Sequence, residues 1–234
     1  MYKYLKFDTG RNALRKLIQI YGLKEMHIPY YLCDVVRHTL VEEGCKPIFY
    51  HVDDKFYPTK EFPKEDFILY PDYWGVCSEN IERLANIYPK LIVDKAHSYF
   101  DAPIGIACFN AGHKFGYKES YLWIKYNNIF EGISDVYNTP FNFFLEDAVK
   151  ARKQKFLELH DKYKDINNLK INIKSKAPFC YPCLVGTIKE ADELVKFLKE
   201  EGKTVYRYWG PLPKSFNEYK FYSRLVPIPI LPLS

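Results

Sequence analysis

The chain has 234 residues, enough for one large domain or for one domain with a small second lobe. Its hydrophobic content of 47% and charged content of 27% are those of a globular protein, and aromatic residues reach 18%. The net charge of +5 comes from 34 basic and 29 acidic residues spread along the chain without an arginine-rich run, which argues against a nucleic-acid-binding protein.

Targeting segments are not evident in the sequence. No apolar run approaches the length of a membrane span. The N-terminal stretch MYKYLKFDTGR lacks the apolar core of a signal peptide. We therefore expect a cytoplasmic protein without a membrane span.

The first predicted helix opens at Thr9-Gly10 and ends at Gly22. Apolar side chains recur along it at helical spacing, at Leu14, Leu17, Ile18 and Tyr21. A helix N-terminus with a glycine at its entrance can hold a phosphate on its free amides. The alternative is a capped surface helix without a ligand.

A strand–helix–strand unit follows this helix. Residues 25–29 predict a short strand, residues 34–43 a helix, and residues 46–52 a second strand, which is the order of a crossover between parallel strands. The charged segment 53–65, which contains prolines, is typical of a surface loop. Residues 67–70 then predict a strand that ends in an aromatic turn over 71–75, and residues 79–88 predict a helix.

Two strand ends carry ionisable groups in the middle of the chain. The apolar run Leu91-Ile92-Val93 stops at Asp94, and His97 follows closely; a second apolar run, 104–109, leads to His113 and Lys114. Neighbouring strands of an α/β sheet that deliver such groups to one edge are where these folds bind ligands. A lone acid and a lone lysine are also common surface features.

The remaining sequence predicts a second, smaller unit. A strand over 121–125 and an irregular stretch over 127–142 precede a long helix over 143–164. A strand over 179–185, a helix over 189–201 and a strand over 204–208 then suggest a small α+β lobe. We place the domains at 1–165 and 166–234.

The six cysteines stand among apolar neighbours, as free buried thiols of a cytoplasmic protein do. Cys180 and Cys183 form a CxxC, which a redox pair or half of a zinc site would use. No second CxxC or histidine pair accompanies it, and it falls in a predicted strand. We therefore expect structural thiols and no metal site.

The sequence D-x-A-H at Asp94 to His97, a short strand, and H-K-F-G at His113 to Gly116 resembles the core of the DegT/DnrJ/EryC1/StrS family. These are fold type I sugar aminotransferases that depend on pyridoxal phosphate. The resemblance implies an α/β large domain with a mostly parallel sheet and a small C-terminal α+β lobe. This chain is shorter than the family's members, so it is identified as a shortened member.

The resemblance also implies a catalytic set and a cofactor, pyridoxal 5'-phosphate. Lys114 would bond covalently to the cofactor, Asp94 would pair with its pyridine nitrogen, and His97 would lie beside its phenolic oxygen. A carboxylate suits the first contact because it keeps the pyridinium protonated and the ring able to accept electrons. A lysine amine becomes a nucleophile when its surroundings lower its pKa.

Further cofactor contacts are carried over by the same resemblance. The helix entrance would bind the phosphate, and either Tyr31 or Cys33 would cover the pyridine face, a choice that the sequence leaves open. Trp74 would line the pocket, and Asn110 would stand near a position where relatives have a serine and this chain has Ala111. The implied cofactor-binding residues are Gly10, Arg11, Asn12, Tyr31, Cys33, Trp74 and Asn110.

The implied activity is transfer of an amino group, from an amino acid such as glutamate, to a keto-sugar nucleotide in surface polysaccharide biosynthesis. Substrates would be a nucleotide-sugar and an amino acid, and the chain would be a homodimer. Two alternatives stay open. The chain could be a non-catalytic relative that binds a nucleotide-sugar or a partner chain, because it lacks the paired glycines that follow the lysine in relatives. It could also be a sugar dehydratase that uses His113 as the base.

Overall fold

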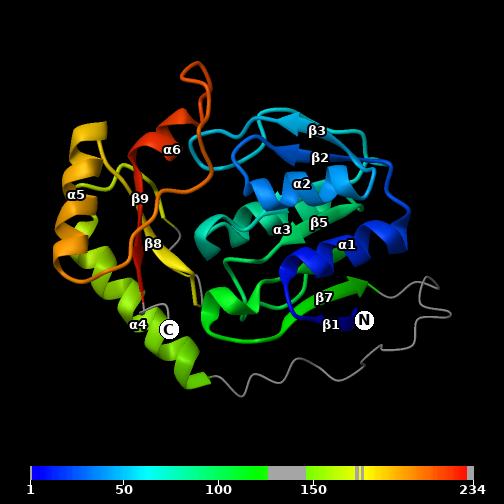
Figure 1. Ribbon diagram of the computed structural model, residues 1–234, viewed down its shortest axis with the longest axis horizontal. Coiled ribbons are helices and arrows are strands. Elements are labelled where there is room, and N and C mark those ends of the chain that lie inside the picture. The colour runs from blue at the N-terminus through cyan, green and yellow to red at the C-terminus, as the bar shows by residue number, and fades with distance from the viewer. Residues whose placement is uncertain (1, 126–145, 172–173, 175–176, 231–234) are drawn as a thin grey trace.

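A seven-stranded sheet runs through the centre of the computed structural model, which describes residues 2–125, 146–171, 174 and 177–230 (Figure 1). Its strand order is β1-β7-β6-β5-β4-β2-β3. The strands are β1 (Tyr2–Phe7), β2 (Glu25–Pro29), β3 (Lys46–Tyr50), β4 (Ile68–Pro71), β5 (Leu91–Asp94), β6 (Ala107–Phe109) and β7 (Ser120–Lys125).

The sheet is parallel from β3 to β6 and antiparallel at β7. Strand β2 pairs in parallel with both β3 and β4, and β4-β5 and β5-β6 are parallel as well. Strand β7 runs antiparallel to both β6 and β1, so β1 points the same way as the parallel strands. The predicted mostly parallel α/β sheet and its strand–helix–strand unit are therefore confirmed.

The edge strand β1 was not predicted from the sequence. Its residues YKYLKF pair with β7 over their whole length, from Tyr2 opposite Lys125 to Phe7 opposite Ser120. Tyr2 and Tyr4 pack against the core on one face of the sheet, and Leu5 is buried in the core on the other face, so the strand lacks a clean period-two alternation.

Helices cover both faces of the sheet, which explains why its central strands are continuously apolar. On β5, Ile92 contacts the core beneath α1 (Gly10–Tyr21) and α2 (Asp34–Glu42), whereas Leu91 and Val93 point to the other core. Helix α3 (Ser78–Ile87) packs on that second face. Every side chain of such a strand meets protein on its own face, so no polar alternation appears in the sequence.

A smaller unit stands beside the large sheet, at the left of Figure 1. Strands β8 (Cys180–Leu184) and β9 (Leu225–Pro229) form an antiparallel pair. Three helices accompany them in the described part of the chain: α4 (Glu146–Tyr163), α5 (Ile188–Glu200) and α6 (Tyr219–Arg224). The predicted α+β character of this lobe is therefore present.

The predicted strand at 204–208 is wrong, because these residues form no ladder. The partner of β8 is instead β9, whose prolines are tolerated because a two-stranded sheet has only edge strands. Segment 204–208 is held by side-chain contacts instead of a strand ladder. The Arg207 guanidinium donates to the Ser223 carbonyl and to the Asp192 carboxylate.

Two further predictions concern boundaries. The irregular stretch at 127–142 and the start of the long helix, 143–145, lie outside the described residues. The domain boundary at 165 stays a prediction. Helix α4 packs against β8, with the rings of Phe156 and Tyr181 5.5 Å apart, so contacts of the smaller unit begin before that boundary.

A buried carboxylate joins the smaller unit to the large sheet. Glu218 is fully buried, accepts a 2.7 Å hydrogen bond from the Val52 amide, and lies 3.0 Å from His51 Nδ1. This contact holds the segment that leads from Trp209 to α6 over the carboxyl edge of the parallel strands. None of the described helices is both long and apolar enough to span a membrane.

Candidate active site

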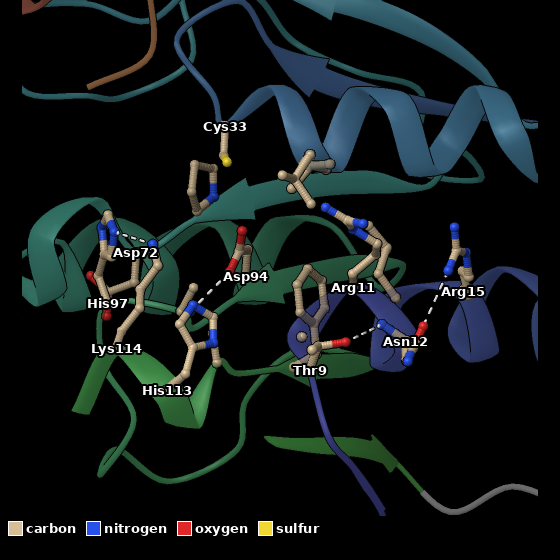
Figure 2. Close-up of a pocket in the computed structure, with 18 of the residues that line it drawn as sticks. Thr9, Arg11, Asn12, Arg15, Cys33, Asp72, Asp94, His97, His113 and Lys114 are labelled. Atoms are coloured by element: carbon tan, nitrogen blue, oxygen red, sulfur yellow. Dashed lines mark hydrogen bonds between the residues drawn. The ribbon is translucent and has the colours of Figure 1, made fainter. Parts of the chain in front are cut away.

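A cavity of about 470 Å³ lies at the carboxyl edge of the parallel strands. Pro71, Asp94 and Phe109 line it from the ends of β4, β5 and β6, and the start of α1 lines it from the side. Figure 2 shows the labelled side chains of this cavity. The edge is the place at which open α/β sheets bind their ligands.

Helix α1 turns its N-terminus toward this cavity. Thr9 caps the helix, because its hydroxyl accepts a 3.2 Å hydrogen bond from the Asn12 amide. The amides of Gly10 and Arg11 precede the first intrahelical bond, Ala13 to Thr9, so they remain for a ligand. Such a helix end attracts an anion through its free amides and its dipole.

The glycine at this helix entrance is required by a close approach. A Cβ atom added to Gly10 would lie 2.7 Å from the Asn110 carbonyl oxygen, closer than such contacts occur. The absent side chain therefore lets α1 begin directly against the loop that follows β6. This contact joins the helix entrance to the loop that carries Lys114.

Asp94 ends β5 with its carboxyl group at the cavity. Its Oδ1 accepts a 2.9 Å hydrogen bond from the Ala96 amide, and it forms no salt bridge within the described residues. Burial raises the pKa of Asp94, although the Ala96 amide and the nearby Lys114 act in the opposite direction. The carboxyl group is thus prepared to receive a cationic or hydrogen-bonding partner from the cavity.

Lys114 stands on the short helix η2 (Gly112–Phe115), which follows β6. The Ser120 hydroxyl accepts a 3.1 Å hydrogen bond from the Gly112 amide and so fixes the start of this turn. The Lys114 amine lies 2.8 Å from His97 Nε2 and 5.5 Å from the centre of the Phe179 ring. Burial lowers the pKa of Lys114, and Asp94 opposes this shift.

His97 is buried with only 3% of its surface exposed, and rings pack against it. Its imidazole stacks on Phe179 at 4.7 Å and 7° and on Trp209 at 5.3 Å and 5°. The Trp74 amide donates a 3.2 Å hydrogen bond to its Nδ1. Burial holds the pKa of His97 well below its usual range, and a positive charge on Lys114 would lower it further.

The structure brings together some of the predicted cofactor contacts and not others. Cys33 lines the cavity, at the N-terminus of α2. Tyr31 and Trp74 are fully buried behind the cavity wall, where Tyr31 stacks on Tyr73 and Trp74 on His97. Asn110 is buried too, and its Oδ1 accepts a hydrogen bond from the Tyr121 amide.

Several cavity residues were not anticipated from the sequence. Trp209 lines the cavity from the smaller unit, with its backbone in the left-handed region at φ 61°. Trp74 shares this conformation at φ 60°, and bulky residues adopt it only where the surroundings enforce it. The other unanticipated lining residues with polar side chains are Thr9, Arg15 and Asp72.

The cysteines take no part in disulfides. All six are free, and Cys180 and Cys183 are both buried in β8. Burial raises the pKa of Cys183 to about 12, so its thiol stays protonated at neutral pH. The described residues contain no group of three histidine, cysteine or acidic side chains that could hold a metal ion.

Comparison of the structure with known proteins gives many similar folds. A DegT DnrJ EryC1 StrS aminotransferase from Brucella abortus matches 97% of this chain and 80% of its own, with a TM-score of 0.70 and 15% identity. Helicobacter pylori PseC, an aminotransferase involved in the biosynthesis of pseudoaminic acid, matches 97% and 81%, with a TM-score of 0.72 and 14% identity.

NtdA from Bacillus subtilis, with bound cofactor PMP, matches 97% of this chain and 68% of its own, with a TM-score of 0.72 and 15% identity. No family model matches the sequence, and neither does any curated protein. The fold is thus that of the fold type I aminotransferases. Across 97% of its length the chain matches structures of the DegT/DnrJ/EryC1/StrS sugar aminotransferases, at low sequence identity.

Proposed function

We propose that the chain is a pyridoxal-phosphate-dependent aminotransferase that transfers an amino group from an amino acid such as glutamate to a keto-sugar nucleotide. The observation that carries this proposal is the convergence of Asp94, His97 and Lys114 on one cavity, opposite the open N-terminus of α1. An acid, an amine and an anion site in one cavity match the three functional ends of pyridoxal phosphate.

The residues present fit this cofactor. The Gly10 and Arg11 amides would hold its phosphate, because they have no acceptor within α1. Asp94 would hold the proton of its ring nitrogen through a charge-assisted hydrogen bond, and its carboxyl group has a single described hydrogen-bond donor. Cys33 lines the same cavity, so it fits the role at the ring face better than Tyr31 does.

Pyridoxal phosphate, when bound, supplies a ring that accepts the electrons released at the substrate carbon. The chain's own contribution is to orient and to move protons. Lys114 would first hold the cofactor covalently and, once released, carry a proton on its amine between the donor's Cα and the cofactor. Burial of this amine lowers its pKa, which favours the uncharged form that can accept that proton.

The two alternative functions make different demands on the same cavity. A dehydratase would need His113 as the base. Lys114 is instead the side chain that lies at hydrogen-bond distance from His97, a member of the proposed catalytic set. A non-catalytic relative would need the cavity only for binding. The presence of Lys114 beside His97 favours the aminotransferase over both.

An absorbance titration with pyridoxal phosphate tests the proposal. We expect a new visible band and, after borohydride reduction, a mass increase on Lys114 located by peptide mass spectrometry. Glutamate should then discharge the band before reduction. Absence of a band, or a label on another lysine, would refute the assignment.

The control variant is Lys114→Ala, which should fold, keep weak affinity for the phosphate end, and acquire no label. A dehydratase would instead form no borohydride-stable adduct and lose activity on replacement of His113. A non-catalytic relative would bind without discharge by any amino acid. The same absorbance and mass-spectrometry measurements therefore distinguish the aminotransferase, the dehydratase and the non-catalytic relative.

A further inference from the structure

The tautomer of His97 follows from its hydrogen bonds. The Trp74 amide can only donate, and it points at His97 Nδ1 from 3.2 Å, so Nδ1 must carry a lone pair. A neutral imidazole then carries its proton on Nε2. The structure therefore fixes the ring in one orientation and one tautomer.

The position of the ring is held as firmly as its tautomer. Phe179 and Trp209 both stack on the imidazole within 7° of parallel. The Phe179 carbonyl accepts a 2.8 Å hydrogen bond from the buried Arg152, which ties this ring to α4. An aromatic surround of this kind excludes water and disfavours the imidazolium form.

Lys114 Nζ lies 2.8 Å from the protonated Nε2. A hydrogen bond between these atoms needs one acceptor, and an ammonium group has no lone pair to offer. The acceptor is therefore the lysine nitrogen, in its uncharged form.

We propose that His97 is a positioning residue that donates a hydrogen bond from Nε2 to Lys114 and so keeps its amine uncharged and nucleophilic in the free chain. This hydrogen bond from Nε2 depends on the Trp74 amide, because its donation to Nδ1 fixes the tautomer of His97. This proposal rests on the proposed function in naming Lys114 as the nucleophile, but it describes the chain before any cofactor binds.

Other ionisable groups also face this amine. Asp94 of β5, Cys33 at the start of α2 and Cys180 of β8 favour the charged amine, and His113 adjoins Lys114 on η2. Burial raises the pKa of the Cys180 thiol, so this thiol stays protonated at neutral pH. Asp94 makes the largest of the contributions that favour the charged amine. The hydrogen bond from His97 acts against Asp94.

Competitive acetylation as a function of pH tests the proposal without a cofactor. The full chain is first dialysed against hydroxylamine to remove any bound carbonyl compound, and is then treated with trace acetic anhydride. Mass spectrometry compares Lys114 with the exposed Lys189, whose side chain is 86% accessible. We expect the midpoint of Lys114 labelling to fall more than about one pH unit below that of Lys189.

Two substitutions separate the hydrogen bond from burial. His97→Phe retains a stacked ring but has no donor, so the midpoint should rise by about one unit, the value of one hydrogen bond to the neutral amine. His97→Gln can accept from the Trp74 amide through its oxygen and donate to Lys114 through its nitrogen, so it should restore a low midpoint. An unchanged midpoint in His97→Phe overturns the proposal.

Nitrogen NMR of the wild-type chain gives a second test that needs no variant. We expect a proton on Nε2 and none on Nδ1 of His97 between about pH 6 and 9. A proton on Nδ1, or a Lys114 midpoint within about one unit of Lys189, overturns the inference. A low labelling midpoint of Lys114 in a chain that does not bind pyridoxal phosphate would support the inference about His97 and reject the proposed function.

Discussion

At the scale of single residues, the cavity combines groups whose protonation states are set by what lies around them. Asp94 and Lys114 are side chains of opposite charge type in one cavity, and burial shifts the pKa of each toward its neutral form. Perturbed groups of this kind gather at functional sites more often than elsewhere. The arrangement therefore supports chemistry at this cavity rather than simple structural packing.

Replacing Asp94 by asparagine separates binding from turnover. The amine of Lys114 remains, so Asp94→Asn should still acquire the borohydride label. It should transaminate slower by about two orders of magnitude or more, because asparagine cannot hold the ring proton by charge. Single-turnover absorbance with glutamate measures the effect. An unchanged rate would remove Asp94 from the proposed role.

Asp72, directly after β4, offers a test of how stability depends on pH. It is buried, its Oδ2 has no hydrogen-bond partner among the described residues, and burial raises its pKa to about 6. An unfolded aspartate has a pKa near 3.9. The folded state therefore holds this proton more tightly, and stability falls as pH rises from about 4 to about 6.

In the wild-type chain the Cys77 amide donates a 2.9 Å hydrogen bond to Asp72 Oδ1. Asp72→Asn removes the titration of this side chain and keeps an oxygen for that hydrogen bond. We expect it to raise the free energy of unfolding by about 2 to 3 kcal/mol above pH 6, with the gain lost below about pH 4. Urea unfolding across this range measures it. The exposed Asp161→Asn is the control, and an equal gain at every pH would contradict the prediction.

At the scale of elements, α1 depends on a glycine at its entrance. Gly10→Ala would set a methyl group 2.7 Å from the Asn110 carbonyl oxygen, and both are backbone-fixed. We expect a loss of about 1 to 3 kcal/mol in stability, as for other overpacked sites. Pyridoxal phosphate should also bind more weakly, because the helix must shift away from the cavity.

The matched control is Gly186→Ala, where the nearest atom is a side-chain oxygen rather than a backbone atom, Glu190 Oε2 at 3.0 Å. Thermal unfolding and cofactor titration of both variants give the comparison. If Gly10→Ala behaved like the control in both measurements, the close approach of α1 to the Lys114 loop would have no energetic weight.

At the scale of the whole molecule, the resemblance implies a homodimer. Active sites of fold type I enzymes are completed by a neighbouring subunit, and a closed two-fold pair is the commonest assembly. We expect size-exclusion chromatography with light scattering to give twice the chain mass of 27.8 kDa at micromolar concentration. A monomer under these conditions would count against the homodimer and favour the non-catalytic alternative.

Sequence patterns determined the local structure to a large extent. The apolar run before Asp94 identified β5 because a strand covered on both faces needs no polar alternation. The D-x-A-H and H-K-F-G motifs indicated the fold, since chain order places them on adjacent strand ends. The fold class and the family that it resembles could therefore be predicted from the sequence.

The surroundings of these groups depend on contacts between segments that lie far apart in the sequence. Trp209 and Phe179 reach His97 from the smaller unit, far along the chain, and no local pattern reports a contact of that range. The same limitation explains the mistaken strand at 204–208, since β8 could pair with either of two later segments. The partner of Nδ1 is a backbone amide, which every non-proline residue carries, so sequence alone cannot reveal that Trp74 fixes the tautomer of His97.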